Sequence, residues 1–380
     1  MPLNIVIDES ITFAQEAFSR FGRILLLNGR NMSNSVIKNA DALIVRSTTV
    51  VNEELIQGSN IKFVGTATIG TDHIDKEYLT SNGITFSDAK GCNSTAVAEY
   101  FITALLAISV KNKINLDGKS IGIVGVGNIG TKVKFLAEVL GLNVVLNDPP
   151  LKEKSSSEIY RPLEELLNCD IITIHTPLTL DGKHPTHHLF NEEVLRKLKE
   201  GVILINSSRG EVVDNIALLD ILKTKKLYTA FDVFESEPNI LTELVNYLTI
   251  ATPHIAGYSY EGKINGTKMI YDAFCKHFSF KPIWEPEYPT AKNSIISITN
   301  SESDEEFFYN ILSHVYPIEN DDKDLRVIRE YSQNARGKYF DTLRKEYFLR
   351  REFNNYYFDN TNISGERTKK LLEIGFNKLV

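Results

Sequence analysis

The stretch Gly125-Val126-Gly127-Asn128-Ile129-Gly130, about one third of the way along the chain, carries three glycines at the spacing Gly-x-Gly-x-x-Gly. A β-branched run, 120–124, precedes this glycine loop, and apolar residues at helical spacing follow it. The first glycine permits a tight turn, the second lets the backbone approach a pyrophosphate, and the third lets helix and strand pack closely. The pattern therefore predicts a strand, a turn and a helix whose N-terminal N–H groups bind a dinucleotide.

An acidic residue follows the glycine loop at the distance expected for a ribose contact. A second predicted strand, 143–146, ends near Asp148, 18 residues after Gly130. A carboxylate there accepts hydrogen bonds from ribose hydroxyls and repels a 2′-phosphate, which favours NAD over NADP. A purely structural glycine turn in another α/β domain is the alternative interpretation.

The composition limits the class of protein. The chain has 380 residues, 42% of them hydrophobic and 24% charged, which is enough for two or three domains. The net charge of −7 argues against nucleic acid as the main partner. The N-terminus lacks a signal peptide pattern, and no stretch is expected to reach transmembrane length, so we expect a cytoplasmic protein. Only three cysteines occur, which excludes a disulfide framework and a four-cysteine zinc site.

The residues before the glycine loop alternate between strand and helix patterns and predict a small doubly wound α/β unit. Its expected strands are 5–7, 24–26, 42–45 and 63–65. Ligands of such sheets bind beyond the carboxyl ends of the strands, where Arg46, Ser47 and Thr68 lie. Arg46 is interpreted either as a solvated loop cation or as an anion-binding residue.

After a long apolar helix expected from Ser94, with Ser94 as its N-cap, the alternation resumes on both sides of Asp148. The further strands are expected at 171–174, 202–205, 228–231 and 248–250, giving a six-stranded nucleotide domain.

Three of these strands end in segments that carry candidate chemistry. Oxidation of an alcohol needs a base, a cation that binds the substrate, and a hydride acceptor. His254 and Arg209 are the candidates for the first two, and Glu237 is the carboxylate expected to orient the histidine. Asp232 is expected to contact the nicotinamide carboxamide. Structural alternatives remain: Arg209 could pair with Glu211, and Glu237 could be an ordinary loop acid.

Histidines also crowd one loop, at His184, His187 and His188, after His175. A zinc site is the alternative for these histidines, but the loop has no acidic or cysteine partner in suitable order. We therefore predict no metal.

Four motifs in order resemble the D-isomer-specific 2-hydroxyacid dehydrogenases: the glycine loop with Asp148, Ser207-Ser208-Arg209-Gly210, the segment 232–238, and Pro253-His254-Ile255-Ala256-Gly257. The resemblance implies that Arg209, Glu237 and His254 are catalytic. It implies NAD contacts at Gly125, Gly127, Asn128, Ile129, Gly130, Asp148, Thr176, Ser207, Ser208, Arg209, Asp232 and Gly257. It implies substrate contacts at Ser47, Thr68 and Tyr258, and we add Arg46 as a hypothesis for a substrate phosphate.

The resemblance extends to a narrower group of these enzymes, through stretches such as 45–48, 63–73 and 254–258. It implies a small phosphorylated 2-hydroxy acid as substrate. The implied fold is α/β, with a flavodoxin-like substrate (lid) domain (1–95 and 256–290), a Rossmann-type NAD-binding domain (96–255) and a small α+β C-terminal dimerisation domain (291–380). The loops 181–188 and 301–306 do not match closely.

The C-terminal region is rich in aromatic residues interleaved with arginine and lysine from 307 to 358. Such surfaces are enriched at protein interfaces, which favours a homodimer, while stacking on nucleic acid is the alternative. Three functions remain open at this point: a dehydrogenase of a phosphorylated 2-hydroxy acid, another enzyme of the same superfamily, and a dinucleotide-sensing protein without turnover.

Overall fold

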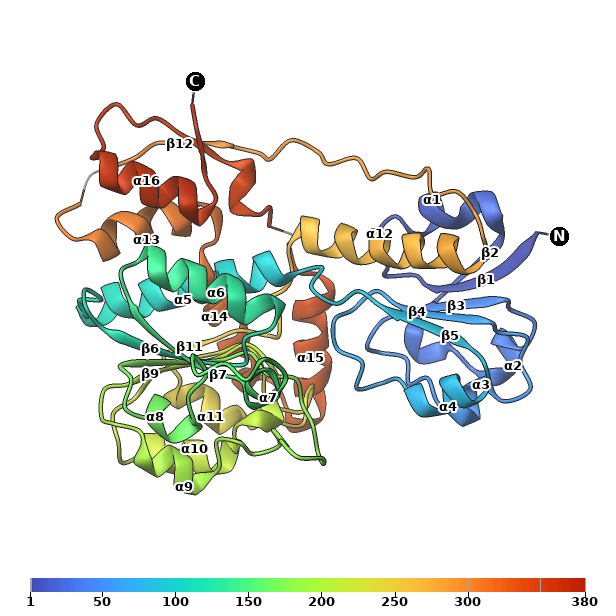
Figure 1. Ribbon diagram of the computed structural model, residues 1–380, viewed down its shortest axis with the longest axis horizontal. Coiled ribbons are helices and arrows are strands. Elements are labelled where there is room, and N and C mark those ends of the chain that lie inside the picture. Colours follow the sequence, from blue (N-terminus) through green and yellow to red (C-terminus); the bar gives the residue numbers. More distant parts are fainter. Residues whose placement is uncertain (1, 300, 349, 380) are drawn as a thin grey trace. The chain divides into compact units, whose positions relative to one another are not determined.

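The computed structural model describes residues 2–299, 301–348 and 350–379, and the chain forms two compact units (Figure 1). The first unit comprises Met1–Asn93 and Ser259–Pro289, and the second comprises Ser94–Tyr258 and Thr290–Val380. The segment 291–380, expected to be a domain of its own, is therefore grouped with residues 94–258.

The first unit is built on a parallel sheet in the order β2-β1-β3-β4-β5. Its strands are β1 (Leu3–Asp8), β2 (Gly22–Leu27), β3 (Ala42–Val45), β4 (Phe63–Thr66) and β5 (Thr85–Asp88). Its helices are α1 (Ala14–Phe18), α2 (Asn34–Ile37), α3 (Glu53–Ile56), α4 (Lys76–Ser81) and α12 (Tyr260–His277). This strand order is that of flavodoxin, so the predicted fold class is confirmed. The half-exposed edge strand β5 was missed because its polar sequence lacks an apolar run.

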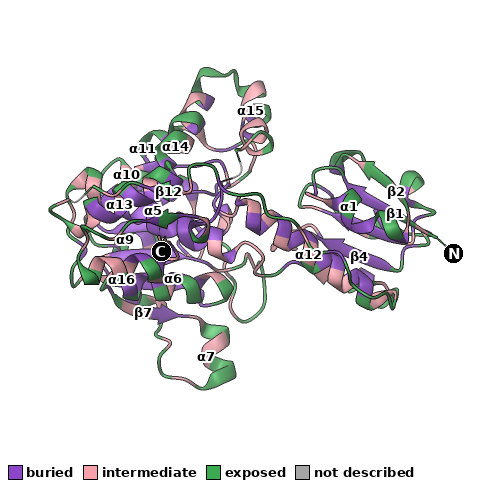
Figure 2. Cartoon of the chain, turned by 90° about the horizontal axis from the view of Figure 1, so that it is seen from above, coloured by how far each residue is buried: buried purple, intermediate pink, exposed green. Residues whose placement is uncertain are grey.

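Helix α12 returns late in the sequence to cover this sheet. A Cβ at Gly65 on β4 would lie 2.5 Å from Ile270 on α12, so the helix approaches the strand too closely for a side chain. Phe274 also packs edge-on against Phe18 of α1, with ring centroids 5.2 Å apart. Figure 2 shows β4 as fully buried. Residues 259–289 thus complete the core of the first unit.

The second unit contains a parallel sheet with the predicted number of six strands, in the order β11-β10-β9-β8-β6-β7. Its strands are β6 (Ser120–Val124), β7 (Asn143–Asn147), β8 (Ile171–Ile174), β9 (Ile203–Asn206), β10 (Tyr228–Phe231) and β11 (Ile250–Ala251). Its helices up to residue 258 are α5 (Ser94–Asn112), α6 (Asn128–Val139), α7 (Pro149–Ser155), α8 (Leu163–Leu166), α9 (Glu192–Lys197), α10 (Asn215–Leu222) and α11 (Thr242–Tyr247). The strand order reverses between β6 and β8, which is where such sheets bind ligands.

Helix α5 is the central helix of the second unit. With 19 residues and a mean hydropathy of 1.3, it is long and apolar enough to cross a membrane, so the expectation that no stretch reaches this length is wrong. However, 83% of the helix window is buried inside the protein (Figure 2). The apolar composition is explained by this core position, and Ser94 is the first residue of the helix instead of its cap.

The C-terminal segment, defined as residues 290–380, packs on α5. It contains α13 (Asp304–Val315), α14 (Ile318–Arg326), α15 (Gln333–Lys345) and α16 (Gly365–Ile374), with a parallel sheet of β12 (Ile295–Ile296), β13 (Tyr357–Phe358) and β14 (Asn377–Lys378). Phe307, Phe308 and Leu312 on α13 belong to the same buried cluster as Phe101 and Leu105 on α5. The segment therefore shares a core with the six-stranded sheet and α5 of the second unit.

Candidate active site

The glycine loop forms the predicted strand–turn–helix, between β6 and α6. Gly125 has a φ of 89°, a left-handed conformation that favours glycine. A Cβ at Gly130 would lie 2.0 Å from the carbonyl oxygen of Gly125, whereas a Cβ at Gly127 would meet no atom within 4 Å. Gly127 is the N-cap of α6, and no side chain caps the helix. The turn thus leaves open space and helix N–H groups where a pyrophosphate would bind.

Two buried hydroxyl groups lie on the loops that follow β8 and β9. Among the described residues, Thr176 Oγ1 and Ser207 Oγ have no hydrogen-bond partner. Thr176 follows His175, and a Cβ at Gly125 would lie 2.8 Å from the backbone of His175. The loop after β8 therefore adjoins the glycine loop. Buried polar groups are normally satisfied, so orphaned hydroxyls beside a dinucleotide turn fit a polar cofactor such as NAD.

Asp148 has two structural contacts in addition to its predicted role. Its Oδ2 accepts the N–H of Val126 in the glycine loop at 2.8 Å, and its Oδ1 caps α7 by accepting the N–H of Leu151 at 2.9 Å. The carboxylate therefore ties the glycine loop to the end of β7. Each oxygen retains a second acceptor position, and the ribose contact stays a prediction.

The segments after β9, β10 and β11 lie together because the three strands are parallel neighbours. A Cβ at Gly210 would lie 1.9 Å from the backbone of Phe234, so the Arg209 segment packs directly on the loop that leads to Glu237. Arg209 is held by its own chain, since its carbonyl accepts from the Asn206 side chain at 3.1 Å and its Nη1 donates to the carbonyl of Ser208 at 2.7 Å.

His254 and Glu237 form a hydrogen-bonded pair. His254 Nδ1 lies 2.6 Å from Glu237 Oε2, and the other oxygen of Glu237 accepts the N–H of Phe234 at 2.9 Å. Burial opposes ionisation of this carboxyl, but the positive charges of His254 and Arg344 outweigh it and lower the pKa of Glu237. With Nδ1 bonded to a carboxylate, Nε2 is the atom left to exchange a proton.

Asp232 organises the turn that carries His254. Its Oδ1 accepts from Thr252 Oγ1 at 2.6 Å and from the N–H of Ile255 at 2.8 Å, and its Oδ2 accepts from the N–H of Ala256 at 2.8 Å. Desolvation raises the pKa of this fully buried carboxyl. The predicted nicotinamide contact stays a prediction, while this structural role was missed because it depends on contacts between neighbouring strand ends.

The predicted substrate residues of the first unit follow its central strands. Arg46 and the exposed Ser47 come directly after β3, and Thr68 lies just beyond β4. Thr68 Oγ1 shares a hydrogen bond with Thr66 Oγ1 at 2.8 Å, and it donates to the carbonyl of Gly70 at 3.0 Å. Their expected place at the carboxyl ends of the strands is thus observed, within this unit.

In the second unit, Tyr258 is in contact with residues that the sequence did not connect to it. Its ring meets Tyr347 of the C-terminal segment edge-on, with centroids 5.9 Å apart. Arg350 donates from Nη1 to the carbonyl of Tyr258 at 3.1 Å and from Nη2 to the carbonyl of Ala256 at 2.8 Å. The C-terminal segment therefore supports the turn that carries His254 and Gly257.

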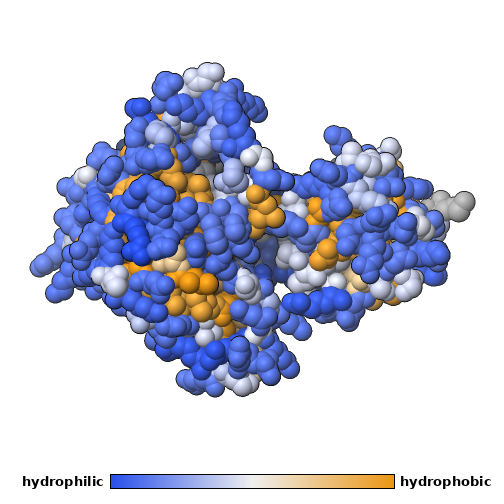
Figure 3. Space-filling view, turned by 90° about the horizontal axis from the view of Figure 1, so that it is seen from below, coloured by the Kyte–Doolittle hydropathy of each residue, from blue (hydrophilic) through white to orange (hydrophobic). Residues whose placement is uncertain are grey.

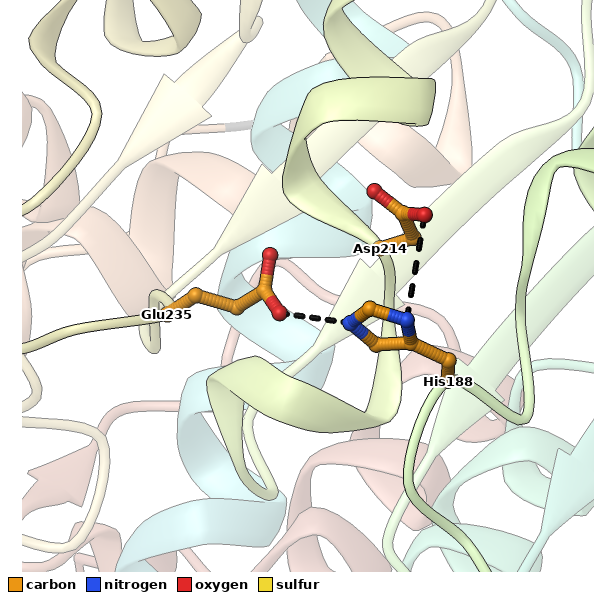
Figure 4. Close-up of side chains that lie close together, drawn as sticks. All are labelled: His188, Asp214 and Glu235. Atoms are coloured by element: carbon orange, nitrogen blue, oxygen red, sulfur yellow. Dashed lines mark hydrogen bonds and ion pairs between the residues drawn. The ribbon is translucent and has the colours of Figure 1, made fainter.

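Two of the crowded histidines, His184 and His188, have acidic partners from other parts of the chain, so the expectation that such partners are lacking is wrong for these two. His188 Nε2 lies 2.6 Å from Glu235 Oε1, and its Nδ1 lies 3.8 Å from Asp214 Oδ2 (Figure 4). Both carboxylates also have contacts with the backbone: Asp214 caps α10, and Glu235 accepts the N–H of Asn215 at 2.9 Å. These contacts give the cluster a structural role, because they hold the histidine loop against the loop that follows β10.

Comparisons with known proteins agree with this geometry. Residues 107–256 match the D-isomer specific 2-hydroxyacid dehydrogenase NAD-binding domain, and residues 288–375 match a domain of unknown function, DUF3410. The chain is 41% identical over 379 residues to erythronate-4-phosphate dehydrogenase of Tolumonas auensis, covering 99% of both chains. It is 40% identical over 378 residues to the protein of the same name from Psychromonas ingrahamii, covering 99% of this chain and 97% of that one.

Solved structures show the same fold over part of the chain. NAD⁺-bound 3-phosphoglycerate dehydrogenase of Entamoeba histolytica is 26% identical with a TM-score of 0.63, covering 73% of this chain and 96% of that one. D-lactate dehydrogenase of Aquifex aeolicus, complexed with NAD and lactic acid, is 26% identical with a TM-score of 0.58, covering 73% and 95%.

Proposed function

The chain belongs to the erythronate-4-phosphate dehydrogenase family, and on that premise we propose that it oxidises 4-phospho-D-erythronate to 3-hydroxy-2-oxo-4-phosphooxybutanoate in pyridoxine biosynthesis. The predicted resemblance to 2-hydroxyacid dehydrogenases is confirmed, and NAD is the cofactor. The observation that carries the chemistry is the 2.6 Å contact between His254 and Glu237, next to the Arg209 segment.

The pair supplies the proton transfer. His254 Nε2 takes the proton of the substrate's 2-hydroxyl, while Glu237 stabilises the imidazolium that forms. NAD, when bound, would supply the hydride acceptor for the carbon that bears this hydroxyl. Oxidation would thus remove one hydride from that carbon and one proton from its hydroxyl, and the proton would go to His254. Arg209 binds the carboxylate of the substrate and polarises the developing carbonyl. In the reverse direction His254 donates the proton.

The phosphate of the substrate requires additional donors. Arg46, Ser47, Thr68 and Tyr258 are the residues we assign to the substrate, with Arg46 assigned to its phosphate. Arginine suits this role because its planar guanidinium can bind two phosphate oxygens at once.

We also propose that the chain forms a homodimer through its C-terminal segment. Support comes from large apolar side chains that the segment exposes, among them Ile295 (61% exposed) and Phe348 (81% exposed). Figure 3 shows that hydrophobic side chains gather in separate patches on a mostly hydrophilic surface. Exposed apolar patches of this kind mark interaction sites.

The substrate assignment is tested by measuring NADH formation with 4-phospho-D-erythronate, 3-phosphoglycerate and glycerate in parallel. We expect turnover of 4-phospho-D-erythronate at the highest kcat/KM. Turnover of 3-phosphoglycerate without turnover of 4-phospho-D-erythronate would reject the substrate, and NAD binding without turnover of any of the three would reject catalysis of this reaction.

A further inference from the structure

Helix α15 of the C-terminal segment lies directly on the loop that carries Glu237. A Cβ at Gly337 on α15 would lie 2.5 Å from Asn239 Oδ1 and 3.4 Å from Pro238 Cγ, so the helix approaches this loop closely at Gly337. One turn later, Phe340 meets Phe234 edge-on with ring centroids 6.5 Å apart. Helix α15 therefore contacts the loop on both sides of Glu237, at Phe234 before it and at Pro238 and Asn239 after it.

The residues that follow α15 brace the second half of the catalytic pair. Tyr347 packs on Tyr258, and the guanidinium of Arg350 donates to carbonyls of the turn 255–258. Arg350 is itself almost fully buried, and its guanidinium lies 4.1 Å from the ring centre of Tyr316. The C-terminal segment thus contacts both the Glu237 loop and the His254 turn.

Arg344 lies between these two contacts, in the last turn of α15. Its guanidinium interacts with the Tyr258 hydroxyl and lies within electrostatic range of the carboxylates of Glu237 and Asp341. Its Nε is buried and has no hydrogen-bond partner among the described residues. A partly buried cation is therefore held near the carboxylate that orients His254.

We propose that Arg344 is a positioning residue for the reaction: its guanidinium keeps Glu237 ionised and Tyr258 oriented, so that the C-terminal segment completes the catalytic centre of the same chain. The proposal rests on the roles given to His254 and Glu237 in the proposed function. It assigns to the domain of unknown function a task beyond any part in dimerisation. The segment acts through Glu237, because a carboxylate that stays charged keeps the imidazole oriented and stabilises it when protonated.

The charge of Arg344 has a consequence for the pH dependence. The titratable and charged groups facing this site are Glu237, His254, Tyr258 and Asp341, with Asp232 behind the histidine turn. Removal of a cation favours the protonated form of every neighbouring group, whether acid or base. Without Arg344, the acidic limb of the kcat/KM profile should therefore move to higher pH.

The test compares Arg344→Met, Arg344→Lys and Arg336→Met with the unsubstituted enzyme. Arg336 lies on the same helix, but its guanidinium bonds to Thr242 Oγ1 and the carbonyl of Tyr331, so its substitution is a matched control. For Arg344→Met we expect kcat to fall about tenfold or more and the acidic limb to move up by about 0.5–1 pH unit. Arg344→Lys should restore the position of the limb, and Arg336→Met should leave it in place.

A lower kcat with an unmoved acidic limb would overturn the proposal, because it would indicate a packing role alone. An increase confined to KM would also overturn it, since Arg344 would then act only on substrate binding. A readout without turnover separates this proposal from the substrate assignment: carbon-13 NMR of the Glu237 carboxyl, assigned with Glu237→Gln. The pKa of Glu237 should rise in Arg344→Met even if the enzyme proved to act on a different 2-hydroxy acid.

Discussion

At the scale of single residues, the histidine of the catalytic pair has an unusual backbone. His254 has a φ of 55° and Ser236, one residue before Glu237, has a φ of 63°. Left-handed conformations are costly for residues other than glycine and persist where surrounding contacts impose them. For His254, the N–H donates to the carbonyl of Asp232 at 2.7 Å. The N–H groups of the next two residues, Ile255 and Ala256, donate to the Asp232 carboxylate.

Replacement of His254 by Asn should remove the proton acceptor and keep the turn, because asparagine tolerates the left-handed conformation. We expect kcat to fall by about 10²–10⁴. The affinity for NADH, followed by its fluorescence, should remain nearly unchanged. Turnover at the unsubstituted rate would remove His254 from its assigned role.

Asp170 shows how a single carboxylate links stability to pH. It accepts the N–H and Oγ of Ser120, each at 2.9 Å, and the Nζ of Lys199 at 2.9 Å. Burial disfavours its charge, but these donors outweigh burial and lower its pKa. Because the folded pKa lies below the unfolded value, the stabilisation is complete above about pH 4 and is lost as the pH falls toward the folded pKa.

For Asp170→Asn we therefore expect a lower free energy of unfolding at pH 7, by about 1–3 kcal/mol. The difference from the unsubstituted protein should shrink as the pH falls below about 4. Urea unfolding at a series of pH values measures both quantities. A difference that stays constant down to pH 2 would contradict the linkage.

At the scale of elements, the turn from β6 to α6 contains glycines that are needed for two different reasons. Gly130 is required by the fold itself, because its Cα faces the carbonyl of Gly125 with no space for a methyl group. Gly127 faces open space and has an extended φ of −76° that any residue adopts, so the protein alone does not require glycine there. We therefore expect glycine to be needed at this position only for the approach of the pyrophosphate.

The two glycines should consequently respond differently to alanine. Gly127→Ala should keep the melting temperature and weaken NAD binding about tenfold or more, because the methyl group occupies the place of the pyrophosphate. Gly130→Ala should lower the melting temperature as well. Calorimetry and titration of NADH fluorescence distinguish the two, and equal losses of stability in both variants would contradict the separation.

At the scale of the whole molecule, the C-terminal segment is part of the second unit's core and, in our proposal, part of its active site. Arg350 donates to the carbonyls of Ala96, Ala256 and Tyr258, so it binds the chain near residues 94 and 258, two of the three points where the chain passes from one unit to the other. Burial disfavours its charge, and the acidic groups around it compensate this cost, including Glu99 and Asp321.

Arg350→Met should therefore be strongly destabilising. Removing one charge leaves buried carbonyls and carboxylates without their partner, which costs about 3–5 kcal/mol. Urea unfolding of the full chain gives this number, and Arg336→Met serves as a control that removes a half-exposed arginine of the same segment. A loss below about 1 kcal/mol would show that the buried cation is not needed.

The homodimer is tested with Phe348→Ser, since this side chain is 81% exposed on the C-terminal segment. If it lies in the dimer interface, sedimentation velocity should show a shift from dimer to monomer at equal protein concentration. The substitution should leave the melting temperature of the monomer unchanged, because the ring makes little contact within its own chain. A monomeric unsubstituted protein would reject the proposal outright.

Local pattern by itself determined the α/β class, the six-stranded sheet, the glycine turn and the order of the three catalytic motifs. The bounds of β3, β6, β8 and β10 coincide with the predicted strands. These features could be predicted because each depends on periodicity and turn chemistry within a dozen residues. The NAD-binding domain and the 2-hydroxyacid dehydrogenase family followed from those same motifs.

Only the tertiary structure decided what lies beside the motifs. The contact of α15 with the Glu237 loop, the position of Arg344 and the acidic partners of His188 join residues that are distant in the chain. Such contacts produce no periodic pattern in the sequence, because the sequence around a charged helical residue does not differ between a residue that faces water and one that faces a buried carboxylate. The burial of a residue and the charges near it depend on tertiary packing. In this protein, packing places the C-terminal segment beside the Glu237 loop, and for that reason we propose it as part of the catalytic centre.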